Sequence, residues 1–191
     1  MTTQKSLCIR KPATIALLAL VMVAFTSPLA TGQQAANSAE AFAKLKGLLG
    51  SWDVTERDRP STKEIATYKL TGGGSVLTED LRAPDGPANA MGHMYTTYHM
   101  DKGQLVMTHF CGAGNQPRMR IKSVEDGGRR IAFEMYDITN LATPESFHSN
   151  AVEVVFHSED RVDLVYRGTR GPAPGARSEQ VFQLTRRKTS F

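Results

Sequence analysis

Cysteine is nearly absent from this chain of 191 residues, which contains only Cys8 and Cys111. Cys8 lies before an apolar N-terminal run and is lost if that run is a cleaved signal. Cys111 then has no partner within the chain, which excludes a framework of disulfides. A lone cysteine of this kind is a small buried hydrophobic residue, or else a metal or redox group.

An excess of basic charge is also missing once the N-terminal segment is set aside. Residues 1–32 hold three of the 23 Lys and Arg residues and none of the 19 Asp and Glu residues, which leaves 20 basic against 19 acidic residues. No long basic stripe remains to engage phosphates. The sequence therefore predicts no nucleic-acid partner.

Sequence signatures of common catalytic sites are lacking as well. The chain has no Gly-x-Ser-x-Gly elbow, phosphate-binding loop or His-Glu-x-x-His helix. Glu79 and Asp80 are neighbours on an expected strand and point to opposite faces, so they do not form a glycosidase-like pair. Enzymatic activity stays open, and a binding protein is the favoured interpretation.

The N-terminus has the layout of a secretory signal peptide. Basic residues, the last of them Lys11, precede an uncharged apolar run over 13–30. Ala30 and Gly32 suit the −3 and −1 positions, so we predict a signal peptide over 1–32. The protein is then exported, periplasmic or secreted, with no stable membrane anchor after cleavage; an uncleaved signal anchor is the alternative.

For the remaining chain, we predict a polar segment over 33–37 and a single β-barrel domain over 38–188. Asn37 and Glu40 fit a capping box at the start of one short helix, which carries apolar residues at helical spacing over 42–49.

Short strands separated by turn-forming residues follow the helix. Many antiparallel strands at this spacing predict an all-β barrel of about 8–10 strands or a sandwich, and closure is favoured because it removes exposed edges. The expected strands are 51–58, 63–71, 74–82, 91–100, 104–111, 118–125, 129–136, 150–157, 161–168 and 178–187.

Residues 108–119 contain the densest group of side chains that could bind a ligand or take part in a reaction. His109 and Cys111 are two residues apart on a strand and share a face. A glycine-containing corner with Asn115 and Gln116 follows, and then Arg118. Soft, titratable and hydrogen-bonding groups are thus crowded where a strand ends, which predicts a site at the mouth of a cavity.

The composition of that site depends on the hairpin at 101–103. A three-residue loop, which the Asp-Lys-Gly sequence favours as a type I turn with a bulge, places His99 on the face of His109. A two-residue loop instead places Tyr98 beside His109. Further along, the connection over 137–148 forms either a local turn or a flap that brings Asn140 and His148 to the site.

A helix leads into the element Gly50-Ser51-Trp52, and antiparallel strands follow. In this opening the chain resembles the calycin superfamily, which includes lipocalins, fatty-acid-binding proteins and haem-binding nitrobindins. More closely, it resembles uncharacterised exported bacterial proteins related to the DUF1579 group. The matching segments are Tyr98-His99, Thr108-His109-Phe110-Cys111, Asn115-Gln116-Pro117-Arg118-Met119, Asp137-Ile138-Thr139-Asn140-Leu141, Phe147-His148 and Phe182-Gln183-Leu184-Thr185-Arg186.

The resemblance implies a calycin-like barrel with an internal cavity and brings no established activity. Nitrobindins place a haem-ligating histidine near the final strands, whereas the last histidine here is His157, so haem is disfavoured. His109 and Cys111 are chemically suited to zinc or copper, but local spacing holds only these two together, and we predict no metal site.

The leading hypothesis is a barrel that binds a small, partly apolar molecule. Alternatives are a small metal- or haem-dependent enzyme in the same cavity, and a non-catalytic interaction or stress-response module. The sequence leaves the ligand, any cofactor and the oligomeric state open. The predicted ligand-binding residues are Tyr98, His99, His109, Cys111, Asn115, Gln116, Arg118, Asn140 and His148.

Overall fold

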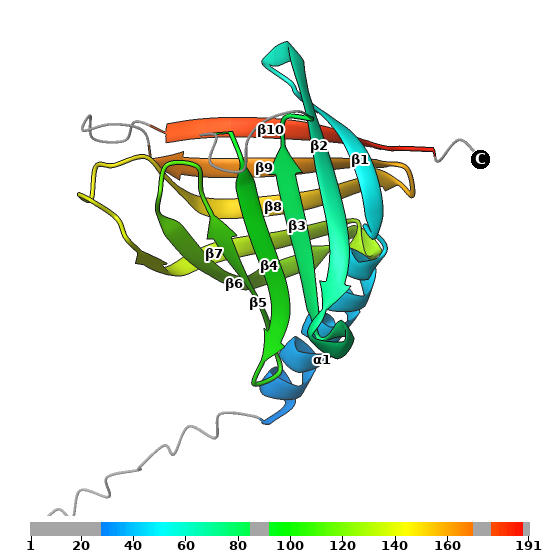
Figure 1. Cartoon of the computed structure of the whole chain (residues 1–191). Helices are drawn as coiled ribbons and strands as arrows, with labels where there is room; N and C mark the ends of the chain where they lie inside the picture. The colour runs from blue at the N-terminus through cyan, green and yellow to red at the C-terminus, as the bar shows by residue number, and fades with distance from the viewer. Residues whose placement is uncertain (1–27, 85–91, 170–176, 189–191) are drawn as a thin grey trace, which may run out of the picture.

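The structure, a computed structural model, describes residues 28–84, 92–169 and 177–188 (Figure 1). Each expected strand is present, with ends shifted by a few residues. The elements are α1 (Pro28–Lys46), β1 (Gly50–Glu56), β2 (Arg59–Thr71), η1 (Gly72–Gly74), β3 (Val76–Arg82), β4 (Met94–Asp101), β5 (Gln104–Phe110), β6 (Gln116–Glu125), η2 (Asp126–Gly128), β7 (Arg130–Thr139), β8 (His148–Ser158), β9 (Arg161–Thr169) and β10 (Arg177–Arg186).

The strands of the described residues close into one antiparallel barrel. Each strand pairs with its neighbours in sequence, and β1 also pairs with β10, where Trp52 lies opposite Arg186. Closure leaves no strand with an unpaired edge. The predicted all-β antiparallel barrel is confirmed, and its architecture is compatible with a calycin-like fold.

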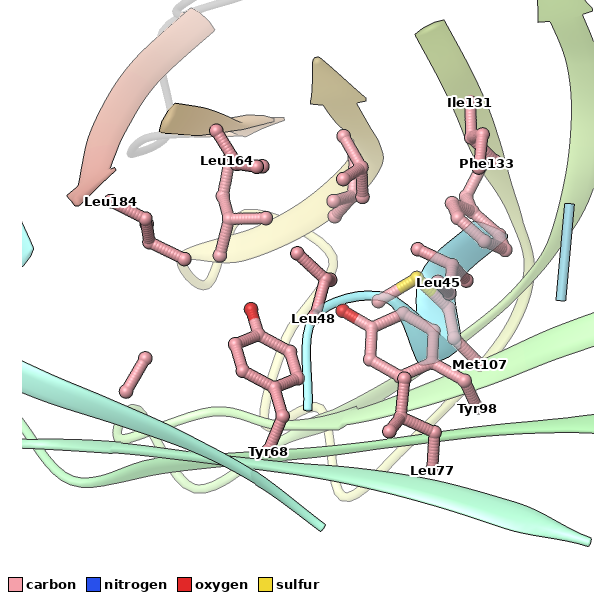
Figure 2. Packing of buried hydrophobic residues seen from close by; sticks show 14 of the residues in the cluster. Leu45, Leu48, Tyr68, Leu77, Tyr98, Met107, Ile131, Phe133, Leu164 and Leu184 are labelled. Atoms are coloured by element: carbon pink, nitrogen blue, oxygen red, sulfur yellow. The ribbon is translucent and has the colours of Figure 1, made fainter. Parts of the chain in front are cut away.

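The interior is lined by alternate residues of every strand, because successive side chains of a strand point to opposite faces. Ile131 and Phe133 of β7, Val152 of β8 and Leu164 of β9 are at most 1% exposed. Figure 2 shows such side chains converging from opposite walls onto a common centre. The apolar rows expected from alternation in the sequence therefore form the core.

Helix α1 begins earlier than the sequence predicted. It starts at Pro28, so Asn37 lies inside the helix and is not its N-cap. Proline suits the first turn of a helix, and the alanine-rich segment that follows has high helix propensity. The predicted signal peptide falls largely on residues 1–27, which lie outside the described residues. No helix among the described residues is both long and apolar enough to cross a membrane.

The C-terminal part of α1 plugs one end of the barrel. Leu45 and Leu48 are completely buried, and Figure 2 shows Leu48 lying above Tyr68 inside the barrel. At the opposite end of the barrel, which we call the open end, lie the loops that follow β1, β5 and β7. The helix thus covers one end of the barrel, and no helix of the described residues covers the other.

A clamp built on Trp52 and Arg186 holds the helix, the first strand and the last strand together. The Trp52 indole N–H donates to the Leu48 carbonyl at 2.7 Å, and the Arg186 guanidinium stacks 4.2 Å from the centre of the indole ring. Arg186 also donates to the carbonyls of Gly47 and Leu49 at 2.8 and 2.9 Å. One side chain therefore satisfies carbonyls that the helix end leaves unpaired.

The β4–β5 hairpin has a two-residue loop, so the three-residue loop favoured from the sequence is wrong. Met100 pairs with Leu105, and the loop is formed by Lys102 and Gly103, both with positive φ. This is the geometry of a tight turn that matches strand twist. As a consequence, Tyr98 shares the inner face with His109, and His99 does not.

We predict that Arg186→Met lowers the free energy of unfolding by about 2–4 kcal/mol, because it removes charged hydrogen bonds and the cation–π contact while keeping most of the side-chain volume. Arg187→Met is the matched control. Its ion pair with Asp53 is exposed, so we expect a change within about 0.5 kcal/mol. Urea denaturation measures both; equal losses in the two variants would contradict the proposed clamp.

Candidate functional site

A row of polar side chains crosses the inner wall of the barrel at one level. Tyr68 pairs with Glu79, Glu79 with Thr96, and Thr96 with His109, on strands β2 to β5 in order. Residues opposite one another in a sheet project from the same face with their Cβ atoms about 5 Å apart. All four are 1% exposed. We call these four residues the polar row.

The Glu79 carboxyl is the centre of the row. It accepts a hydrogen bond of 2.7 Å from the hydroxyl of Tyr98, which reaches across from β4. Burial raises the pKa of Glu79 to about 7, although the hydroxyls of Tyr98 and Tyr68 lower it in part. Because burial also raises the pKa of both tyrosines well above the ordinary value, their hydroxyls remain proton donors.

His109 closes the other end of the row as a neutral imidazole. Its Nδ1 shares a hydrogen bond of 3.0 Å with the Thr96 hydroxyl, and its ring lies 5.0 Å from the ring of Tyr166 on β9. Burial lowers the pKa of His109 to about 4. The imidazole therefore acts as a hydrogen-bonding group and not as a positive charge at neutral pH.

Two tyrosine hydroxyls of this cluster are buried without completing a hydrogen bond. The Tyr68 hydroxyl faces Glu79 and the Tyr166 hydroxyl faces Thr96, each close enough to affect a pKa, but neither has a partner of full hydrogen-bond geometry. Buried hydroxyls are nearly always satisfied in folded proteins. Figure 2 shows Tyr68 and Tyr98 rising from the same wall with their hydroxyls inside the barrel.

Cys111 lies just beyond β5, in a tight corner at the open end. Its N–H donates to the Asn115 carbonyl at 3.0 Å, and its own carbonyl accepts from Gly114 at 2.9 Å. Partial burial raises the pKa of the Cys111 thiol, and the N–H of Ala113 lowers it only in part. A thiol with a raised pKa is a poor nucleophile, and His109 bonds to Thr96 and not to Cys111.

At the open end, predicted polar residues join the loop after β5 to the loop after β7 by hydrogen bonds. Asn115 is buried and donates to the Phe147 carbonyl at 2.7 Å, while its own Oδ1 has no partner. The exposed Asn140 side chain donates to the Gly114 carbonyl at 2.5 Å. His148 is buried with Nδ1 2.7 Å from the Ser146 carbonyl. Asn140 thus fastens the connection. His148, although buried, lies opposite Thr169, which belongs to the outer face of β9.

Three other predicted ligand residues lie apart from the polar row. His99 alternates with Tyr98 and is on the outer face of β4. Arg118 is exposed and pairs with Asp137 on the neighbouring strand. Gln116 accepts from the Thr139 hydroxyl at 2.8 Å and donates to Gly114 at 2.9 Å. The structure therefore brings Tyr98 and His109 together and leaves these three outside the interior.

A hollow of about 750 Å³ opens at the open end of the barrel. Its lining combines Phe147 with charged and polar residues at the adjoining ends of β1, β2 and β10: Glu56, Asp58, Arg59, Ser178, Glu179 and Gln180. Gln180 pairs with Tyr166 across β9 and β10. One residue of the lining is therefore the direct pair partner of Tyr166, whose ring touches that of His109.

Sequence reasoning missed Tyr68, Glu79, Thr96 and Tyr166 as site residues. A signal for Glu79 existed, because it interrupts the apolar alternation of Leu77 and Leu81. The pairing that joins the four residues comes from strand register, which a single sequence does not display.

Among the described residues, no three or more His, Cys, Asp or Glu side chains converge in a way that could hold a metal ion. No protein-family model matches the chain, and no curated protein matches it. The site is therefore interpreted from its own geometry.

Glu79 and His109 are expected to affect stability in opposite directions as pH changes. The pKa of Glu79 is about 7 against an ordinary 4.5, so its contribution is complete below pH 4.5 and is lost as pH rises to 7. The pKa of His109 is about 4 against 6.5, so its contribution is complete above pH 6.5 and is lost as pH falls to 4. Each change amounts to about 3 kcal/mol.

We predict that the stability of Glu79→Gln relative to the wild type improves by about 3 kcal/mol between pH 4.5 and 7, since the variant lacks the buried acid. His109→Gln should improve relative to the wild type as pH falls from 6.5 to 4. Urea denaturation at several pH values measures both differences. Glu134→Gln, on the outer face beside Arg120, is the control. A Glu79→Gln difference that does not change with pH would contradict the assigned environment.

Proposed function

We propose that this barrel binds a small, partly apolar molecule in its interior, with a polar group of the molecule held at the polar row. The observation that carries this proposal is the pair of buried hydroxyls, of Tyr68 and Tyr166, that have no complete hydrogen bond. An occupant with a polar group would satisfy both. The surrounding apolar side chains would bury the rest of the molecule at about 25 cal/mol per Å².

The open end supports this proposal because it offers a route inward. The hollow there reaches Gln180, which is paired with Tyr166. At the other end, Leu45 and Leu48 fill the barrel. A ligand would therefore enter beside Phe147 and Gln180 and meet Tyr166 and His109 first.

We also propose that the protein is exported and related to the DUF1579 group. The first proposal rests on the basic and apolar N-terminal segment, and the second on the His-x-Cys and Asn-Gln-Pro-Arg-Met segments. Identifying the N-terminal residue of protein secreted by expressing cells tests the export proposal: cleavage after Gly32 supports it, and an intact N-terminus contradicts it.

We predict that the protein binds hexanol, used as a neutral probe with an apolar tail, and that His109→Phe abolishes this binding. The phenyl ring removes the hydrogen-bonding imidazole and adds bulk beside Tyr166. Binding is measured by NMR chemical-shift changes, which should map to the inner wall of β2 to β5 and β9.

His157→Phe is the matched control, since His157 is exposed and pairs with Asp163. This variant should bind hexanol as the wild type does, and circular dichroism should show that both variants are folded. Shift changes confined to the outer surface, or equal binding by the two variants, would place the site elsewhere.

A further inference from the structure

Positive charge is kept out of the interior of this barrel. Of the Lys and Arg side chains that the structure describes, none is buried. Several that are partly buried are engaged away from the polar row: Arg186 stacks on Trp52 at the helix end, and Arg130 and Arg167 both pair with Glu153, which alternates with the inward residues of β8. Arg59 lines the hollow at the open end, where it pairs with Glu56, but no described Lys or Arg is paired with a member of the polar row.

Carboxyl groups, in contrast, do face inward. Glu79 is 1% exposed, and its partners are tyrosine hydroxyls and not a cation. Glu64 of β2 lies on the same face as Ala66 and Tyr68, nearer to the open end, and its Oε2 is buried without a partner. Burial raises the pKa of Glu64, as does the charge of Glu56, while the charge of Arg59 lowers it in part. Two carboxyl groups thus lie along the inner face of one side of the barrel, and of these two, Glu79 is the one with no basic side chain among the described residues close enough to shift its pKa.

Aromatic rings surround the deeper of these carboxyl groups. Tyr68 and Tyr98 flank Glu79 from β2 and β4, and both interact with its carboxyl. Tyr166 faces it from β9, close enough for the charge of Glu79 to raise its pKa. A carboxylate among tyrosine hydroxyls provides two features that hold an ammonium group: a counter-ion and hydroxyl oxygens that accept its N–H groups.

We propose that the interior site selects a protonated amine with an apolar body, whose ammonium group binds at Glu79 among Tyr68, Tyr98 and Tyr166. This inference rests on the proposed ligand-binding function and names the class of ligand. The three N–H donors of an ammonium group would bond to Glu79 and to the oxygen atoms of the two unsatisfied tyrosine hydroxyls. A carboxylate ligand would instead place a second negative group beside Glu79 with no cation to offset it.

Three probes with the same chain test this inference: hexylamine, hexanol and hexanoate, titrated at pH 8 by calorimetry. We expect hexylamine to bind roughly ten- to a hundredfold more tightly than hexanol, which is the gain of a charged hydrogen bond over a neutral one. Hexanoate should bind more weakly than hexanol. Hexylamine stays protonated at this pH, as a lysine side chain does.

The outcomes for the wild type separate the inference from the proposed function. If hexanol binds in the interior and hexylamine binds no more tightly, the amine inference is overturned and the binding function stands. If none of the three probes binds, both are overturned. Tightest binding by hexanoate would overturn the amine inference and indicate binding beside a cation, such as Arg59 in the lining of the hollow.

Variants of the protein test whether the preference for hexylamine depends on Glu79. Glu79→Gln should remove the preference for hexylamine over hexanol, and Tyr68→Phe should reduce it, while Glu134→Gln on the outer face should leave it unchanged. If Glu79→Gln does not fold, Tyr68→Phe and the pH dependence of hexylamine affinity test the inference instead.

The affinity for hexylamine should fall about tenfold per pH unit below the pKa of Glu79. The titratable groups that face Glu79 are Tyr68, Tyr98, Tyr166 and His109. A preference that is the same at pH 5 and pH 8 would overturn the assignment to this carboxyl.

Discussion

Exclusion of water from the closed barrel is the constraint on which the rest of this structure depends. Because β1 pairs with β10 and the C-terminal turns of α1 fill one end, inward side chains cannot find partners in bulk solvent. The Trp52–Arg186 clamp maintains this closure by joining the helix end to the last strand. Every polar group on the inner wall must therefore be satisfied by another inward group or by an occupant.

The same exclusion explains the opposite pKa shifts of Glu79 and His109. Burial disfavours the charged form of each, which raises the pKa of an acid and lowers that of a base. Both groups are thus held neutral near pH 6, where the interior carries little net charge. Such a wall can accept a ligand cation by ionising Glu79 at a modest cost, whereas a ligand anion would need a charged imidazole that the environment opposes.

The register of one hairpin shows where sequence reasoning was sufficient and where it was not. Alternation and turn residues were enough to predict ten strands and a barrel, because each signal lies within one strand or one turn. At the β4–β5 turn, Lys102 has a φ of 46°, which costs a residue with a side chain about 1–2 kcal/mol. The complete burial of Tyr98 stabilises the fold by about 1.5–3 kcal/mol. Core burial therefore outweighed turn preference, and the locally favoured loop was the wrong choice.

That register also decides which residues make up the site. With His99 facing inward, the wall would present a second imidazole to His109 and a metal-binding arrangement would be plausible. With Tyr98 inward instead, the wall presents a hydroxyl that reaches Glu79, and the site becomes a carboxyl among tyrosines. A shift of one residue thus replaces a second inward imidazole with a tyrosine hydroxyl that bonds to a buried carboxyl. Local motifs such as His109 and Cys111 marked the right strand, but the chemistry belongs to the neighbours that pairing supplies.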